Sequence, residues 1–228
     1  LRQSIFSRLA GYEDVNDADR DCRDPVMRQL VGGRAVKRGA ASASAMGRFE
    51  TATLTQAENL AALADLSGHW IDAVHAKRPS KVIGLDMDSY ESPVYGDQEG
   101  AIWNGHFQSK CLHPLFVFNQ FGDLERCVLR PGNVHSADGW KELLSPVLAR
   151  YSAKARHSII RRRFRGDAAF AIPGLFDLLE AEGWDYAIRM KANPKLHEQV
   201  AFLTKRPRGR PPNHVVRRYT SFHYRAKS

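Results

Sequence analysis

Residues 82–89 read Val82-Ile83-Gly84-Leu85-Asp86-Met87-Asp88-Ser89, an apolar run that ends in two aspartates. A short apolar run of this kind is typical of a buried β-strand. Because side chains alternate between the two faces of a strand, both carboxylates fall on the same face. Two like charges this close favour a neutralising divalent cation, and Mg²⁺ prefers carboxylate oxygens. The pattern predicts a strand with a metal-binding pair; the alternative is two solvated acids that open a loop.

A third carboxylate follows another candidate strand. Asp167 comes directly after the segment 159–166, which begins with two isoleucines. If this strand lies beside the strand at 82–88, the carboxylates meet at one edge of the sheet. Carboxylates from neighbouring strands can hold two metal ions about 3.5–4 Å apart, an arrangement suited to phosphoryl transfer. The alternative is that Asp167 caps a turn or the helix that follows.

The chain beyond residue 81 alternates between strands and helices. We expect strands at 82–87, 111–119, 124–129, 157–164 and 185–190, and helices at 136–151 and 173–182. The turn residues at 119–123 predict a hairpin between the second and third strands. A long crossover after the third strand can return the fourth strand beside the first. The order predicts an α/β fold with a mixed sheet covered by helices.

The first eighty residues show helical spacing of apolar side chains instead. Asp24-Pro25 is typical of an N-cap followed by proline at the first helical position, and Gly32-Gly33 is typical of a helix end. The small, polar and basic residues 34–48 predict an exposed loop. A second long helix should follow, closed by Lys77-Arg78-Pro79. We therefore expect a mainly helical N-terminal region.

Charge indicates a polyanionic partner. The net charge is +9 with a pI of about 9.7, and residues 151–228 alone carry 17 basic and 6 acidic side chains, a net charge of +11. No apolar stretch is long enough to span a membrane, and the first residues show no signal peptide, so we expect a cytoplasmic protein. Three cysteines without C-x-x-C spacing indicate neither a zinc cluster nor a disulfide framework.

Two groups of arginines are candidates for DNA contacts. Arg161, Arg162, Arg163 and Arg165 precede Asp167 and suit phosphate binding, with solvated surface charges as the alternative. Arg208 and Arg210 lie in the segment Lys-Arg-Pro-Arg-Gly-Arg-Pro-Pro at 205–212. This segment resembles AT-hook peptides, whose extended arginines enter a narrow A·T minor groove. A basic linker with phosphate contacts alone is the alternative.

Several motifs, in chain order, resemble those of the DDE transposases of bacterial insertion sequences. They are Leu85-Asp86-Met87-Asp88, the segments 95–106 and 111–115, Leu129-Arg130-Pro131-Gly132-Asn133-Val134-His135-Ser136 and Arg165-Gly166-Asp167. The group it resembles reads D-x-D, H-G-x-Q-E-G, L-R-P-G-N-x-H and R-x-D-S-G-F. The resemblance implies a ribonuclease H-like catalytic domain and two Mg²⁺ ions, with Mn²⁺ as a substitute. It also implies strand transfer on double-stranded DNA, at terminal inverted repeats and a target site, by a homodimer in a synaptic complex.

The family's catalytic residues carry over only in part. The first catalytic aspartate corresponds to Asp88, with Asp86 as the alternative, and the second corresponds to Asp167. The chain departs from the family at Ala168-Ala169, where Ser-Gly is usual, and at Tyr95, where His is usual. The family's glutamate lies on a helix beyond the last residue of this sequence. The resemblance therefore predicts a chain truncated before that glutamate and inactive by itself.

These observations predict three regions. Residues 1–80 form a helical region that binds DNA, residues 81–204 form an incomplete ribonuclease H-like core, and residues 205–228 form a basic linker and the start of a further strand. The leading interpretation is a fragment of a DNA transposase that uses Mg²⁺ to cleave and join phosphodiesters. The alternatives are a ribonuclease H-like nuclease that cuts without joining, and a catalytically inactive DNA-binding remnant.

Overall fold

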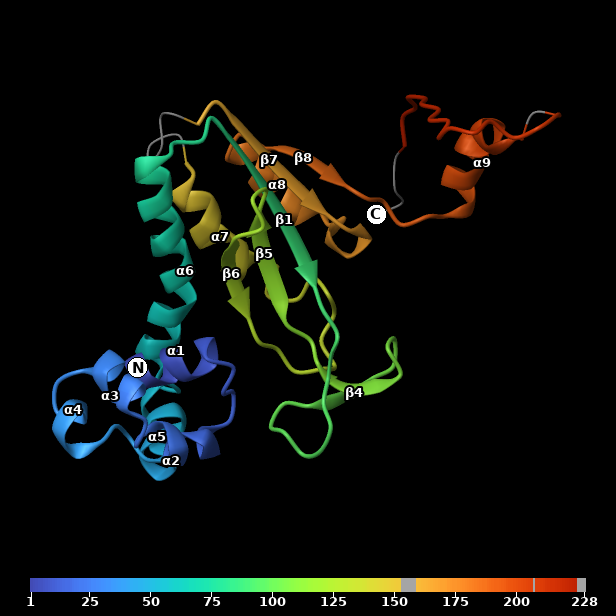
Figure 1. Cartoon of the computed structure of the whole chain (residues 1–228). Helices are drawn as coiled ribbons and strands as arrows, with labels where there is room; N and C mark the ends of the chain where they lie inside the picture. Colours follow the sequence, from blue (N-terminus) through green and yellow to red (C-terminus); the bar gives the residue numbers. More distant parts are fainter. Residues whose placement is uncertain (153–158, 207, 225–228) are drawn as a thin grey trace. The chain divides into compact units, whose positions relative to one another are not determined.

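The computed structural model describes residues 1–152, 159–206 and 208–224. The chain divides into two compact units, Leu1–Trp70 and Ile71–Ser228. The long helix α6 (Ala57–Lys77) runs across the boundary between them (Figure 1). The division of the chain at residues 80 and 204 stays a prediction.

Short helices make up the N-terminal unit, in agreement with the sequence pattern. They are α1 (Arg2–Leu9), η1 (Val15–Asp17), α2 (Ala18–Asp21), α3 (Pro25–Val31), α4 (Ala35–Arg38), α5 (Ala43–Arg48), η2 (Phe49–Thr53) and the first part of α6. At the start of α3 the Asp24 carboxylate accepts a hydrogen bond from the Met27 amide, and Gly32 ends the helix with a φ of 74°. The predicted loop at 34–48 is wrong, because α4 and α5 occupy most of it and Ser42 caps α5.

Polar contacts contribute much of the internal structure of the N-terminal unit. Its buried apolar residues are small or flexible: Ala18, Met27, Ala35 and Met46. The Gln3 side chain is 4% exposed and forms two hydrogen bonds of 2.7 Å with the backbone of Ala41. The Ser7 hydroxyl donates to the buried carboxylate of Asp21. These buried polar groups are therefore satisfied by partners within the unit.

A five-stranded sheet is central to the C-terminal unit. Its strands are β1 (Val82–Ser89), β5 (Leu115–Asn119), β6 (Leu124–Val128), β7 (Arg161–Gly166) and β8 (Asp185–Ile188), in the spatial order β6-β5-β1-β7-β8 (Figure 1). β1 pairs antiparallel with β5 and parallel with β7, and β7 pairs parallel with β8. The crossover through α7 (Trp140–Arg150) thus returns β7 beside β1. The predicted α/β mixed sheet is confirmed, and its topology is ribonuclease H-like.

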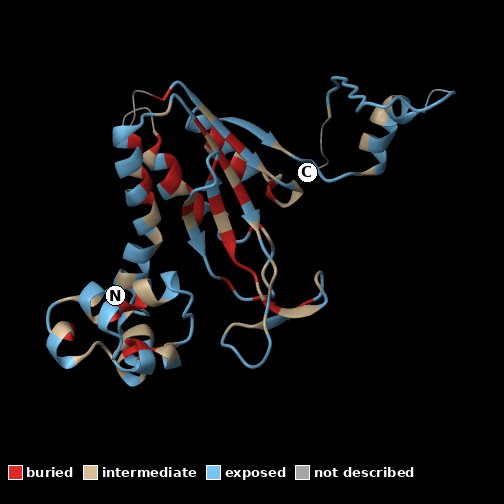
Figure 2. Ribbon diagram, viewed as in Figure 1, coloured by how far each residue is buried: buried red, intermediate tan, exposed pale blue. Residues whose placement is uncertain are grey.

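Helices α7 and α8 (Pro173–Ala181) pack against one face of this sheet. Along β1, Ile83, Leu85 and Met87 are at most 1% exposed and belong to the same buried cluster as residues of both helices. Asp86 and Asp88, which alternate with these residues, belong to the opposite face and are more exposed. Figure 2 shows this alternation as buried and exposed bands along the strands. The sheet therefore has one covered face and one open face within the described part of the unit.

Three elements differ from the sequence prediction. The strand expected at 111–119 is two strands, β4 (Ser109–Leu112) and β5, separated by His113-Pro114. β4 pairs with β2 (Ser92–Pro93) and β3 (Ile102–Asn104) in a small second sheet that the pattern did not predict, because these strands are only two and three residues long. The strand expected at 157–164 is observed at Arg161–Gly166, and residues 157 and 158 lie outside the described residues.

The connection between β6 and α7 folds around a buried arginine. Arg130 is 7% exposed, and its Nε donates to the carbonyl of His113 at 2.8 Å. Its Nη1 donates to three carbonyls of the same connection, those of His135, Ser136 and Asp138. The L-R-P-G-N-x-H motif therefore has a structural role at its arginine, which ties the loop to the end of the second sheet.

Gly132 of this motif has no room for a side chain. A Cβ atom there would lie 2.1 Å from the carbonyl oxygen of Cys111 and 2.4 Å from that of Ile102. We expect Gly132→Ala to lower the free energy of unfolding by about 3 kcal/mol or more, because backbone must move to relieve the overlap. Urea denaturation measures the loss. Gly105→Ala is the matched control, since a Cβ at Gly105 meets nothing within 4 Å; equal stabilities of the two variants would contradict the prediction.

Candidate active site

Asp86 and Asp88 lie on the open face of β1, as the alternation predicts. The inward side chains of Leu85 and Met87 fix this orientation because they are buried in the core. Asp88 lies opposite Phe116 of β5 and Asp86 lies opposite Phe118. The two phenylalanine rings stack with centroids 5.8 Å apart. The carboxylates therefore stand beside a pair of aromatic rings that sequence reasoning did not assign to the site, although their spacing of two residues would have placed them on one face.

The parallel pairing of β1 and β7 brings Asp167 to the same place. Asp86 is the register partner of Arg165 and Met87 is the partner of Gly166. The pairing ends there, and the next residues of the two segments are Asp88 and Asp167; neighbouring strands are about 4.8 Å apart. The electrostatics agree with this placement. Burial raises the pKa of Asp88, the Ser89 amide opposes this by hydrogen bonding to the carboxylate, and the negative charges of Asp167 and Asp86 raise the pKa further.

Asp86 differs from Asp88 in having a cationic partner. The Arg165 guanidinium donates to both carboxylate oxygens of Asp86 through Nε and one terminal nitrogen. Hydrogen bonding to Asp86 raises the pKa of Arg165, and the Coulomb attraction between the two groups adds to it. The ion pair is accessible to solvent, since the Arg165 side chain is 74% exposed and the Asp86 side chain is 38% exposed.

Asp167 also serves the turn that follows β7. One of its carboxylate oxygens accepts a hydrogen bond from the Ala169 amide at 2.9 Å, which caps the short helix η3 (Ala168–Phe170). The corresponding bond in Asp88 runs from the Ser89 amide at 2.8 Å. Each carboxylate therefore has one oxygen engaged locally, and its other oxygen has no hydrogen-bond donor among the described residues. Asp167 can therefore cap η3 and also lie near Asp88, so the two interpretations of this residue are compatible.

The arginines of β7 fall on two faces. Arg161, Arg163 and Arg165 share the open face with Asp86, whereas Arg162 lies on the other face and its Nε donates to the carbonyl of Tyr151. Arg165 forms an ion pair with Asp86. Arg161 and Arg163 are exposed and form no ion pair within the described part of the chain. The geometry therefore separates two arginines that can reach a phosphate from two that have partners in the fold.

Arg208 and Arg210 lie after helix α9 (Pro194–Thr204), in an exposed segment. Gly209 between them has a φ of 118°, which other residues rarely adopt. Nearby, Arg218 donates to the carbonyls of Leu203 and Lys205 at the end of α9. The two arginines of the hook-like segment are thus presented to solvent.

Apart from Asp86, which is paired with Arg165, no acid of the described residues joins the Asp88 and Asp167 carboxylates. Residues 1–152, 159–206 and 208–224 contain no cluster of three or more His, Cys, Asp or Glu side chains arranged to hold a metal ion. Glu180 of α8 accepts a hydrogen bond from the Tyr186 hydroxyl at 2.7 Å instead. The site as described therefore offers two neighbouring carboxylates and a third, Asp86, in an ion pair.

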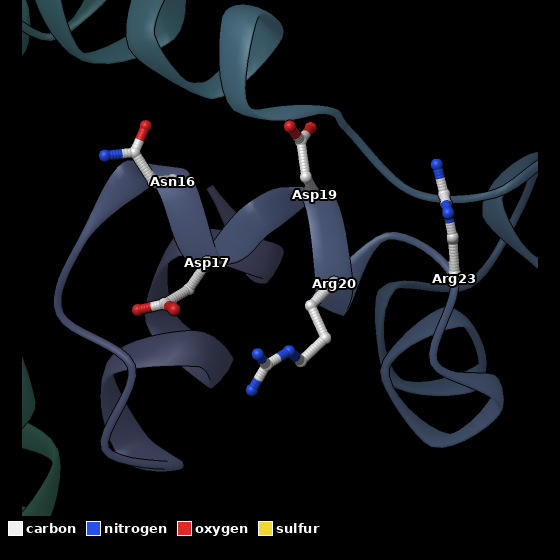
Figure 3. Close-up of a pocket in the computed structure, with 5 residues that line it drawn as sticks. All are labelled: Asn16, Asp17, Asp19, Arg20 and Arg23. Atoms are coloured by element: carbon white, nitrogen blue, oxygen red, sulfur yellow. The ribbon is translucent and has the colours of Figure 1, made fainter.

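A surface depression in the N-terminal unit does not offer a competing site. It is lined by Asn16, Asp17, Asp19, Arg20 and Arg23. Figure 3 shows that the side chains diverge, with Asp19 and Arg23 on one side of the ribbon and Asp17 and Arg20 on the other. Charged groups that point away from one another do not form a binding site.

No helix within the described residues is long and apolar enough to cross a membrane.

The raised pKa of Asp88 leads to a prediction about stability. Because the pKa is higher in the folded than in the unfolded chain, the ionised carboxylate destabilises the fold above the folded pKa, and this effect vanishes below the unfolded pKa, where Asp88 is protonated in both states. We expect Asp88→Asn to raise the melting temperature slightly at pH 7 and to leave it unchanged near pH 3. Thermal melts by circular dichroism measure the difference. Asp86→Asn is the control and should not stabilise the protein at pH 7, because it removes the ion pair with Arg165.

Comparison with known proteins identifies the family of the chain. The family model described as Transposase DDE domain group 1 matches residues 1–228. No curated protein matches the sequence. Among solved structures, a piggyBac transposase synaptic complex with hairpin DNA is 15% identical, with 92% of this chain and 41% of that chain covered and a TM-score of 0.38. The Mos1 transposase paired-end complex with the left transposon end is 16% identical, with 82% and 58% covered and a TM-score of 0.29.

The Mos1 strand transfer complex is 17% identical to the chain, with 90% of this chain and 63% of that chain covered and a TM-score of 0.30. This chain thus spans about two fifths to three fifths of the length of these structural neighbours. The family model, in contrast, covers every residue of the sequence. The chain therefore belongs to the transposases with a DDE domain of group 1.

Proposed function

We propose that the chain supplies Asp88 and Asp167 to the active site of a DNA transposase that cleaves and joins phosphodiesters at terminal inverted repeats. The observation that supports the proposal is the parallel register of β1 and β7, which ends at Met87 and Gly166, so that Asp88 and Asp167 are the next residues of the two segments. In this proposal residues 1–80 bind DNA, residues 81–204 hold the catalytic core and residues 205–228 form a basic linker. The protein acts in the cytoplasm, as a homodimer that pairs two DNA ends.

The two carboxylates fit Mg²⁺, or Mn²⁺ in its place. Their mutual repulsion contributes to the raised pKa of Asp88, and a divalent cation between them would relieve it. Mg²⁺ commonly binds one or two protein carboxylates and takes its remaining ligands from water and substrate phosphates. When bound at this position, the ion would activate an attacking oxygen and stabilise a leaving oxygen. Asp88 and Asp167 would hold it, with Asp86 as the further candidate ligand.

The basic side chains around the site suit a DNA backbone. Arg161 and Arg163 extend along the same open face as the carboxylates and are exposed. Arg208 and Arg210 are exposed in the hook-like segment, where they suit either an A·T minor groove or phosphates. Arg162 and Arg165, which have partners within the fold, contribute less to DNA binding in the free protein.

The test is cleavage and strand transfer of DNA that carries terminal inverted repeats, by the 228-residue chain and by a longer protein that contains it. Because Arg165 engages Asp86, only Asp88 and Asp167 are available as ligands among the described residues. We therefore expect the 228-residue chain to bind this DNA and to cut it at least about a hundredfold more slowly than the longer protein, each 1.4 kcal/mol of barrier being about tenfold in rate. Asp88→Asn or Asp167→Asn should abolish cleavage and joining by the longer protein. Asp177→Asn, at an exposed position on α8, is the matched control.

The outcomes separate the three interpretations. Joining that depends on Asp167 supports the transposase. Cleavage without joining identifies a nuclease, and DNA binding without any cleavage by the longer protein identifies an inactive remnant. Efficient cleavage that survives Asp167→Asn would contradict the assignment of the site, because the chemistry would then use other residues.

A further inference from the structure

The ion pair between Arg165 and Asp86 occupies a carboxylate next to the candidate metal site. Asp86 is two residues before Asp88 on the same face of β1, and Arg165 of β7 is two residues before Asp167, which directly follows the strand. Residues two apart on one face of a strand are separated by about 6.4–6.8 Å. The carboxylates of Asp86, Asp88 and Asp167 and the guanidinium of Arg165 therefore lie within one two-residue repeat of the two neighbouring segments. Asp88 and Asp167 have no cationic partner among the described residues, and Asp86 is a third carboxylate whose charge is neutralised by Arg165.

The pair has the properties of an exchangeable contact. Arg165 is 74% exposed and Asp86 is 38% exposed at their side chains. Exposed ion pairs are weak, because water solvates both groups well. A phosphate offers a guanidinium the same two-point geometry as a carboxylate. A DNA phosphate placed at the Asp88 and Asp167 carboxylates would thus lie within one two-residue repeat of the Arg165 guanidinium, which can donate hydrogen bonds to it.

We propose that Arg165 is an exchangeable counter-ion: it neutralises Asp86 in the DNA-free protein and moves to a DNA phosphate when DNA binds, which releases Asp86 to join Asp88 and Asp167 around the metal ion. This inference rests on the proposed function, since it takes the metal and the DNA from it. It gives the D-x-D pair two distinct roles. Asp88 is a ligand at all times, and Asp86 becomes a ligand only when Arg165 has left it.

The exchange links metal binding to DNA binding. While Arg165 holds Asp86, its positive charge opposes a cation nearby and one carboxylate is engaged. When a phosphate takes Arg165, the carboxylate is freed and the phosphate adds oxygen ligands of its own. By thermodynamic reciprocity, a metal ion that recruits Asp86 also favours the phosphate-bound state of Arg165. The site would then bind its metal more tightly when the DNA is in place.

The test is a titration of the full 228-residue chain with Mn²⁺ in the absence of DNA, followed by the electron paramagnetic resonance of free Mn²⁺. We expect Arg165→Gln to bind Mn²⁺ about three- to tenfold more tightly than the unmodified protein, because a positive charge is removed and Asp86 is freed. The gain should disappear in the Asp86→Asn/Arg165→Gln double variant. Arg161→Gln is the matched control, since it removes the same charge from the same face of β7, four residues from Arg165, and should change the affinity by less than about twofold.

A second measurement does not depend on the folding of Arg165→Gln. In the DNA-free protein Asp86→Asn should leave Mn²⁺ affinity within about twofold, whereas Asp88→Asn should lower it at least about tenfold. The Nε–H resonance of Arg165 should shift when a short duplex is added without metal. The proposal is overturned if Arg165→Gln binds Mn²⁺ no more tightly, if Asp86→Asn weakens binding as much as Asp88→Asn, or if the Arg165 resonance does not respond to DNA.

These readouts are independent of DNA cleavage. If the proposed transposase activity fails in the cleavage assay, the Mn²⁺ affinities still report whether Arg165 restrains Asp86. If the affinities fail while cleavage depends on Asp88 and Asp167, the proposed function stands and Arg165 is a fixed structural partner of Asp86.

Discussion

The in-register parallel pairing of β1 with β7 is the constraint on which the candidate site depends. The pairing ends at Met87 and Gly166, directly before the two carboxylates, which are 79 residues apart in the sequence. Burial of Leu85, Met87 and Phe164 on the covered face holds the register. A slip by one residue would turn these side chains outward, at a cost of several kcal/mol of buried apolar surface. The core therefore positions the acids from the covered face of the sheet.

The same alternation distributes the charges of β7. Arg162, on the covered side, donates to the Tyr151 carbonyl, and the Tyr151 hydroxyl donates to Glu125, which is 1% exposed. Glu125 is in turn paired with Arg150, which also binds Asp72 of α6. A buried carboxylate is tolerated here because it has several donors. One face of β7 thus connects to a structural network, while the other carries cations toward the carboxylates.

Much of the fold could be predicted from the sequence, because the spacing of apolar residues and the capping of helices depend on residues close together in the chain. The strand at 82–89, the crossover and the Asp24 cap followed from such patterns. The second sheet was missed because its strands are too short for alternation to register, and α4 and α5 were missed because the small residues at 34–48 lack an apolar stripe. The division of the four arginines of β7 between two faces follows from the alternation of side chains along a strand. The engagement of Asp86 by Arg165 required the register between strands, which no local pattern provides.

The most direct measurement of the central claim is a crystal structure of the chain soaked in Mn²⁺, with anomalous scattering used to find the ion. We expect an anomalous peak within direct coordination distance of one oxygen of Asp88 and one oxygen of Asp167, on the open face of the sheet. A peak bound by other residues alone, or Asp88 and Asp167 on different faces of the sheet, would contradict it.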